Sequence, residues 1–90
     1  MAKVLISLKI FPSDINADLD LLKKKIESSL PEYASVYKFE EEPVAFGLTV
    51  LIVHILLPEE RSGGIDEVES TLMRISQISQ FETQMVRRIS

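Results

Sequence analysis

The stretch from Glu40 to Leu57 reads E-E-E-P-V-A-F-G-L-T-V-L-I-V-H-I-L-L and contains the longest apolar run of the chain, Leu48 to Leu57. Only Thr49 and His54 interrupt that run. A membrane span needs roughly 20 apolar residues, so this run is too short to cross a bilayer, and its Val and Ile content favours a strand over a helix. Both alternating sets of side chains are mostly apolar, which predicts a central strand that is covered on both faces at least in part.

Upstream of this strand, the sequence predicts a strand and a helix. Residues Lys3 to Phe11 alternate, and one of the two faces is clearly apolar. A helix then begins near Asp14, Asn16 or Asp18, each of which can cap it, and ends before Pro31. Its apolar side chains recur at three- and four-residue steps. The positions predicted to be buried in these two elements are Val4, Ile6, Leu8, Ile10, Leu19, Leu22 and Ile26.

A second strand is predicted from Tyr33 to Glu40, with Tyr37 and Phe39 on one face because they are two residues apart. The turn from Glu41 to Val44 then returns the chain as the long apolar strand. Two strands joined by so short a turn form an antiparallel hairpin.

Beyond Pro58, a charged loop from Glu59 to Gly64 leads into a second amphipathic helix, for which Gly64 is the predicted N-cap. The apolar positions of this helix are Ile65, Val68, Leu72 and Ile75. The last segment, Ile78 to Ile89, is predicted to be a strand. Its alternation slips between Met85 and Val86, which indicates a bulge or a frayed end.

The predicted order is therefore β-α-β-β-α-β, which is typical of an α+β ferredoxin-like sandwich. Both helices are expected on one face of a four-stranded antiparallel sheet, with the first and third strands in the middle and the second and fourth at the edges. The opposite face of the sheet is expected to be open and to expose apolar surface that could bind a partner.

Length and composition indicate a single soluble domain, residues 1–90. The chain is 46% hydrophobic and 27% charged, with a formal net charge of -4. That charge argues against direct binding of nucleic acid, because phosphate neutralisation needs clustered Lys and Arg. Without cysteine, neither a disulfide framework nor a thiolate zinc site is possible. Nothing at the N-terminus resembles a signal peptide, so a cytoplasmic protein that does not bind membranes is expected.

Few residues carry a chemical motif. His54 is the only histidine and is interpreted as a hydrogen-bonded, partly buried side chain, since a metal site would need further ligands. The acids Glu40 to Glu42 could bind a divalent cation, but consecutive carboxylates in a turn are usually solvated. Gly63-Gly64 lacks the G-x-x-x-x-G-K-[ST] pattern of a phosphate-binding loop and is interpreted as a flexible loop. No nucleophile can be paired with a base, so no enzyme, no metal and no cofactor are predicted.

One segment of the sequence is distinctive enough to be compared with a known family. The octapeptide E-E-P-V-A-F-G-L, Glu41 to Leu48, closely resembles the archaeal elongation factor 1-beta family, together with the first strand, L-K-K-K-I in the first helix and V-R-R-I near the end. This resemblance covers essentially the whole chain. Eukaryotic relatives carry G-[FY]-G-[IL] at the matching position, where this chain has Ala45-Phe46-Gly47-Leu48.

The resemblance implies guanine-nucleotide exchange on elongation factor 1-alpha, the GTPase that carries aminoacyl-tRNA to the ribosome. In the family, the aromatic residue of the G-[FY]-G segment lies against the GTPase, and a basic residue close to the C-terminus acts near its magnesium site. Phe46 matches the aromatic residue, and Arg87 or Arg88 could match the basic one. The residues expected at the partner surface are Glu41, Glu42, Ala45, Phe46, Gly47, Arg87 and Arg88.

Fold alone does not determine function, because ferredoxin-like domains also include RNA-binding and small-molecule-binding modules. Tyr37 and Phe39 could form a small aromatic surface for RNA, although no K/R-G-F/Y-G/A-F-V strand is present. A bound metabolite or salt-sensitive RNA binding would favour this alternative over nucleotide exchange.

Overall fold

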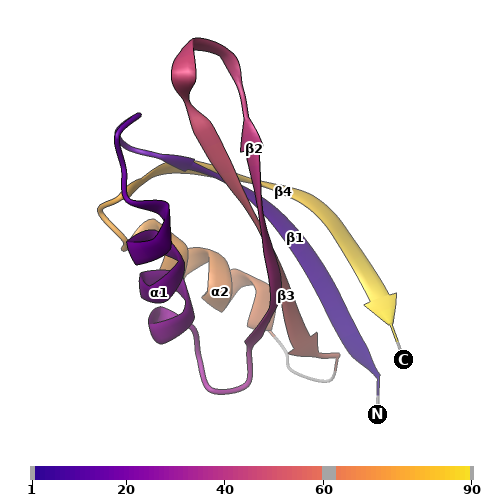
Figure 1. Cartoon of the computed structure of the whole chain (residues 1–90). Helices are drawn as coiled ribbons and strands as arrows, with labels where there is room; N and C mark the ends of the chain where they lie inside the picture. The colour runs from indigo at the N-terminus through magenta and orange to yellow at the C-terminus, as the bar shows by residue number, and fades with distance from the viewer. Residues whose placement is uncertain (1, 60–62, 90) are drawn as a thin grey trace.

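A computed structural model describes residues 2–59 and 63–89 of the chain (Figure 1). The elements are β1 (Lys3–Pro12), α1 (Leu19–Ser29), β2 (Ser35–Pro43), β3 (Thr49–Pro58), α2 (Gly64–Met73) and β4 (Ile78–Ile89). The predicted β-α-β-β-α-β order is therefore confirmed.

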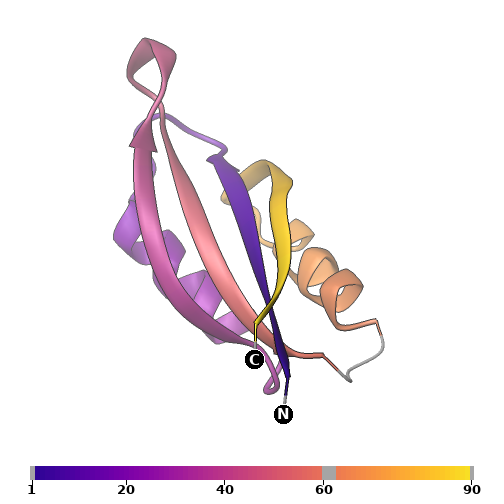
Figure 2. The same cartoon turned by 90° about the vertical axis from the view of Figure 1, so that its right-hand side faces the viewer.

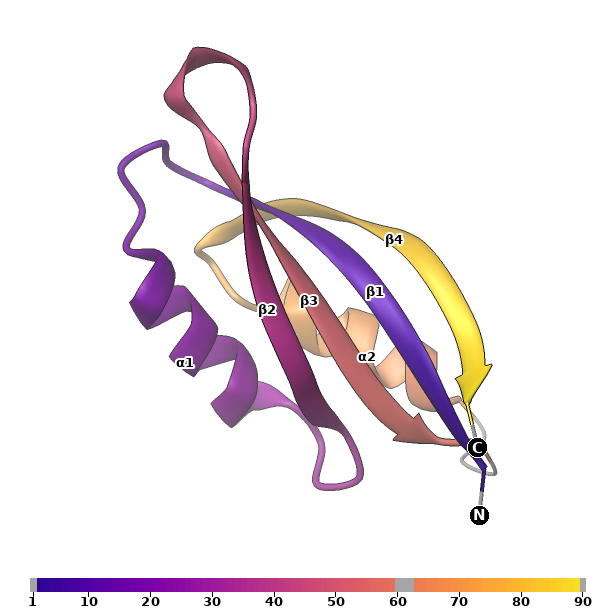
Figure 3. The same cartoon turned by 45° about the vertical axis from the view of Figure 1, so that its right-hand side comes forward.

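The four strands form one antiparallel sheet in the order β2-β3-β1-β4. The central position of β1 and β3 and the edge position of β2 and β4 are as predicted. Figures 2 and 3 show α1 and α2 on the same face of this twisted sheet, which is the ferredoxin-like arrangement. No helix of the described residues lies over the opposite face.

The core lies between the helices and the sheet, as the periodicity of the sequence predicts. It combines alternate residues of β1 and β3 with one stripe of each helix. Val4 and Leu19 pack at its edge and are only partly buried. The buried members are Ile6, Leu8, Ile10, Leu22, Ile26, Leu51, Val53, Ile55, Leu57, Val68, Leu72 and Ile75.

The helix starts follow the capping rules, with one correction. Asp18 caps α1 by accepting a hydrogen bond from the backbone N–H of Leu21 at 3.1 Å. The cap of α2 is Gly63 and not the predicted Gly64, because the left-handed turn before the helix occurs at Gly63, with a φ of 73°. The predicted loop from Glu59 to Gly64 includes residues 60–62, which lie outside the described residues.

Bulges change which side chains share a face. In β2, Val36 pairs with Ile55 and Lys38 with the next residue, His54, so Tyr37 is the extra residue of a bulge. The prediction that Tyr37 and Phe39 lie on one face is therefore wrong: Phe39 packs against the core, and Tyr37 is exposed.

The pairing of β4 with β1 has two register shifts, and the one nearer the predicted slip is one residue away from it. Ser7 of β1 pairs with Met85, and the next β1 residue, Leu8, pairs with Thr83. The extra residue is therefore Gln84, and Met85 and Val86 both lie in regular pairing beyond it.

The face of the sheet without helices is partly covered by its own side chains. Leu5 and Val50 lie on this face but are 7% and 0% exposed. Charged side chains from neighbouring strands cross it, such as Lys9, whose Nζ lies 3.6 Å from a carboxylate oxygen of Glu42. Apolar surface remains on this face at the exposed Tyr37 and Met85 and at the half-buried Ile52 and Leu56.

Within the described residues, neither helix has the length and apolar character needed to cross a membrane.

Candidate functional site

The hairpin of β2 and β3 extends beyond the rest of the sheet and ends in an isolated tip (Figures 1 and 3). Pairing between β2 and β3 continues to Pro43 and Thr49, whereas pairing of β3 with β1 ends at Leu51. The principal extents of the molecule are 42 × 21 × 17 Å. The tip, which we define as residues 44–48, is therefore presented at one end of an elongated molecule.

A tight turn closes the tip. The backbone N–H of Val44 donates to the carbonyl oxygen of Leu48 at 2.7 Å, and the N–H of Leu48 donates to the carbonyl oxygen of Ala45 at 3.4 Å. Between them, Phe46 has φ 62° and Gly47 has φ 77°. Positive φ at both central residues is the pattern of a type I′ turn, the turn whose twist matches a two-stranded ribbon.

Phe46 combines an unfavourable backbone conformation with a side chain that is exposed to solvent. A left-handed conformation costs a residue with a side chain about 1–2 kcal/mol, and the residues usually found there are Gly, Asn and Asp. The side chain is 97% exposed, so it gains no burial in the free protein. Backbone strain of this kind clusters at functional sites, which makes Phe46 the leading candidate for a contact residue.

Phe46 therefore projects away from the core, and it does so from the turn and not from the strand that the sequence predicts to follow Val44. Its neighbours Ala45 and Gly47 are also exposed. The Phe-Gly pair was the available sequence signal, since Gly commonly occupies the second central position of a type I′ turn.

The predicted turn from Glu41 to Val44 is largely strand, because β2 continues to Pro43. Successive acids point to opposite faces of this strand. Glu41 lies on the helix side and accepts a hydrogen bond from Lys23 of α1 at 2.9 Å, a contact that raises the pKa of Lys23. Glu42 pairs with Lys9 on the other face. Both carboxylates remain 45% and 44% exposed, in keeping with the interpretation as solvated acids, and each also has a lysine partner.

The third acid, Glu40, belongs to a hydrogen-bonded chain across three strands. Its carboxylate lies 2.6 Å from Nε2 of His54, and Nδ1 of the same ring lies 2.7 Å from the hydroxyl of Ser7. A carboxylate only accepts, so Nε2 carries a proton, and in the neutral ring the Ser7 hydroxyl donates to Nδ1. The interpretation of His54 as a satisfied, partly buried side chain is confirmed, with 14% of the side chain exposed.

This chain leads to a prediction about acid stability. The hydrogen bond from His54, and secondarily the charge of Lys38, lower the pKa of Glu40. A lowered pKa in the folded state stabilises the fold above the ordinary glutamate pKa of about 4.3, and that stabilisation is lost as the pH falls through the folded value. Glu40→Gln should therefore reduce the urea midpoint at pH 7, and the difference from the parent should shrink toward pH 3.

The control for this prediction is Glu32→Gln, which removes an exposed acid that has no ion pair within the described part of the chain. It should change the urea midpoint little at pH 7. A difference between Glu40→Gln and the parent that stays constant from pH 7 to pH 3 would contradict the assigned role of Glu40.

Arg87 and Arg88 lie near the far end of the sheet from the tip. Arg87 is level with Leu5 of β1, which pairs with Leu56 of β3. At about 3.3 Å per residue, Leu56 is roughly 23 Å along β3 from Thr49, the strand residue next to the tip. The distance from Arg87 to the tip is therefore at least as long. The structure therefore does not bring these arginines together with Phe46.

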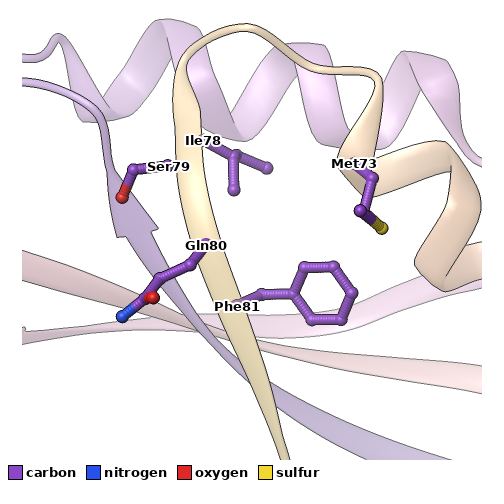
Figure 4. A pocket seen from close by; sticks show the side chains of 5 residues that line it. All are labelled: Met73, Ile78, Ser79, Gln80 and Phe81. Atoms are coloured by element: carbon purple, nitrogen blue, oxygen red, sulfur yellow. The ribbon is translucent and has the colours of Figure 1, made fainter.

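Three further observations bear on binding. A hollow of about 300 Å³ lies between the end of α2 and the start of β4, and Figure 4 shows Met73, Ile78 and Phe81 pointing toward one another there. In the described ranges, no three His, Cys, Asp or Glu side chains are grouped as metal ligands. Separation of Tyr37 from Phe39 removes the aromatic pair on which the RNA-binding alternative depended.

Comparison with known proteins assigns the chain to a family. Residues 5–89 match the model of the EF-1 guanine nucleotide exchange domain. The chain is 47% identical over 90 residues to elongation factor 1-beta of Staphylothermus marinus, with all of both chains covered. It is 38% identical to the Desulfurococcus amylolyticus protein of that name, again over the full length of both, and 36% identical to the Ignicoccus hospitalis protein, covering 96% of it. The chain therefore belongs to the archaeal elongation factor 1-beta family.

Proposed function

We propose that this protein is a translation elongation factor that promotes exchange of GDP for GTP on elongation factor 1-alpha. Family membership supports this function, and the observation that carries its site is the strained, 97% exposed Phe46 at the end of the projecting hairpin. The protein would act in the cytoplasm as a regulator of a GTPase. It would make and break no covalent bonds itself, and it would bind neither nucleic acid nor membrane directly.

The tip is suited to serve as an anchor in a pocket of the GTPase. An exposed aromatic side chain gains free energy only when a partner covers it, and buried aromatic side chains are typical hot spots of protein interfaces. Gly47 next to it has no other atom within 4 Å of the position that a Cβ would take, so the partner's backbone can approach closely there. Ala45, Phe46 and Gly47 would form the central contact, with Glu41 and Glu42 at its margin.

The arginines would form a second contact. Because they are roughly 23 Å or more from the tip, a single GTPase must lie along the length of the sheet to touch both ends. Bound GDP is held by the amide-lined P-loop and by a magnesium ion shared between protein and phosphate oxygens. A factor that contacts two separated regions can displace the P-loop or disturb the magnesium site, with Phe46 at one end and Arg87 or Arg88 at the other.

Exchange then follows from linkage. If the factor binds the nucleotide-free GTPase more tightly than the loaded GTPase, it lowers the affinity for nucleotide by the same ratio. GDP leaves, GTP enters from solution, and bound GTP lowers the affinity for the factor. The factor is thereby released and can act again.

The experiment that tests this proposal compares the affinity of the protein for nucleotide-free elongation factor 1-alpha with its affinity for the GDP-bound form. Calorimetry should give tighter binding to the nucleotide-free form, and the ratio should equal the loss of GDP affinity caused by the protein. Equal affinities for the two forms would refute an exchange function, since a ligand without differential affinity shifts no equilibrium.

A further inference from the structure

The two arginines of β4 face opposite sides of the sheet and differ in their partners. Arg88 lies opposite Val4, on the helix side, and its Nε is 3.0 Å from a carboxylate oxygen of Glu59. Arg87 lies opposite Leu5, on the face without helices. Within the described residues, its guanidinium forms no ion pair. Within the described part of the chain, Arg87 is therefore an exposed cation that a ligand can reach.

Arg87 also lines a small hollow, which we call the Arg87 pocket. Its volume is about 120 Å³, and it is lined by Leu5, Tyr37, Arg87 and Ile89. The bulge in β2 brings Tyr37 into this set, since regular alternation would have placed that ring elsewhere. The pocket thus combines a guanidinium and a phenol, both hydrogen-bond donors, with the apolar side chains of Leu5 and Ile89.

We propose that the Arg87 pocket binds an Asp or Glu side chain of the GTPase partner; this inference rests on the proposed function for the identity of that partner. A planar guanidinium matches a carboxylate with two parallel hydrogen bonds, and the Tyr37 hydroxyl supplies a further donor. Leu5 and Ile89 fit the methylene groups that carry the carboxylate. The pocket lies beside exposed backbone of an edge strand, where a partner can reach it.

The lining favours a carboxylate over a phosphate. Phosphate sites in proteins usually supply several cations or a set of backbone amides at a helix N-terminus. Among the described residues that line the pocket, Arg87 is the only cation, and all four belong to strands. One guanidinium and one phenol suit a single negative charge.

The test measures affinity for nucleotide-free elongation factor 1-alpha with three single variants. Arg87→Gln should weaken binding about tenfold, as expected for an interface arginine. Arg87→Lys should fall between Arg87→Gln and the parent, because an ammonium cannot make the paired hydrogen bonds. Tyr37→Phe should weaken binding severalfold. Thermal unfolding should be close to that of the parent for all three, since both positions are exposed.

The matched control is Arg74→Gln, which removes the same charge from an exposed position just after α2. Its affinity should stay near that of the parent. Equal losses of affinity for Arg87→Gln and Arg74→Gln would show that the effect comes from net charge. That result would refute carboxylate binding in the Arg87 pocket. A loss seen with GDP-bound but not with nucleotide-free GTPase would identify a phosphate as the anion and also overturn it.

The outcomes separate this inference from the proposed function. If the parent protein accelerates GDP release and Arg87→Gln does so with unchanged affinity, the Arg87 pocket is refuted and the exchange function stands. If the parent protein neither binds the GTPase nor accelerates release, the exchange function is refuted, and the pocket is refuted with it.

Discussion

Replacing Phe46 with alanine is expected to slow the stimulated release of GDP from elongation factor 1-alpha by about tenfold or more, since loss of an aromatic anchor typically costs about 2 kcal/mol or more of binding. The melting temperature should change little. The side chain is 97% exposed, so its removal opens no cavity in the core. The measurement is the rate of fluorescent GDP release at a fixed, subsaturating concentration of the factor, together with a thermal melt.

Phe46→Tyr is the control, because it keeps the ring and the backbone requirement of the turn. It should retain most of the stimulation. If Phe46→Ala unfolds the protein, Phe46 is a structural residue; if it stimulates release as fast as the parent, the tip is not the anchor.

Leu72→Ala should show the reverse behaviour, with a free energy of unfolding about 2–5 kcal/mol lower than that of the parent. Leu72 is 0% exposed and belongs to the core cluster between α2 and the sheet. Truncation leaves a cavity that the surrounding side chains fill only in part. A loss of this size is a large fraction of the roughly 5–15 kcal/mol that stabilises a natural domain. Urea denaturation monitored by circular dichroism measures it.

The adjacent Met73 provides the matched control. It occupies the next position of the same helix but is 75% exposed, so Met73→Ala should change the free energy of unfolding by about 0.5 kcal/mol or less. At temperatures where Leu72→Ala remains folded, it should still stimulate GDP release. Equal losses of stability for Leu72→Ala and Met73→Ala would contradict the assigned core.

The fold was predictable because the spacing of apolar residues along the sequence identifies the buried face of each strand and helix. Alternation from Val4 to Ile10 and three- and four-residue steps such as Leu22 to Ile26 mark side chains that are buried in the structure. The long apolar run could only be a central strand, which set the order of the sheet. Each of these inferences uses residues close together in sequence, where hydrophobic pattern is most informative.

The features that could not be predicted depend on contacts between distant residues or on local backbone exceptions. The partner of Glu41 is Lys23 on a helix, and the partner of Glu42 is Lys9 on the first strand, so neither pair has a local pattern. A bulge such as that at Tyr37 needs no special residue and becomes visible only in the register of two paired strands.

The turn at the tip is a local backbone exception that the sequence pattern did not predict. A phenylalanine with positive φ goes against the preferences of that residue, so local rules placed Phe46 in the strand. Local preferences are most often violated where a position serves binding and not stability. The error in the sequence-based prediction at Phe46 therefore agrees with the proposed role of the tip.

The exchange function is tested most directly by one kinetic measurement: release of fluorescent GDP from an archaeal elongation factor 1-alpha, in excess unlabelled nucleotide, with and without this protein. We expect the release rate to rise with the concentration of the protein and then to saturate, and we expect the Phe46→Ala variant to require a higher concentration for the same rate. A release rate that is independent of the protein over the whole concentration range would contradict the exchange function.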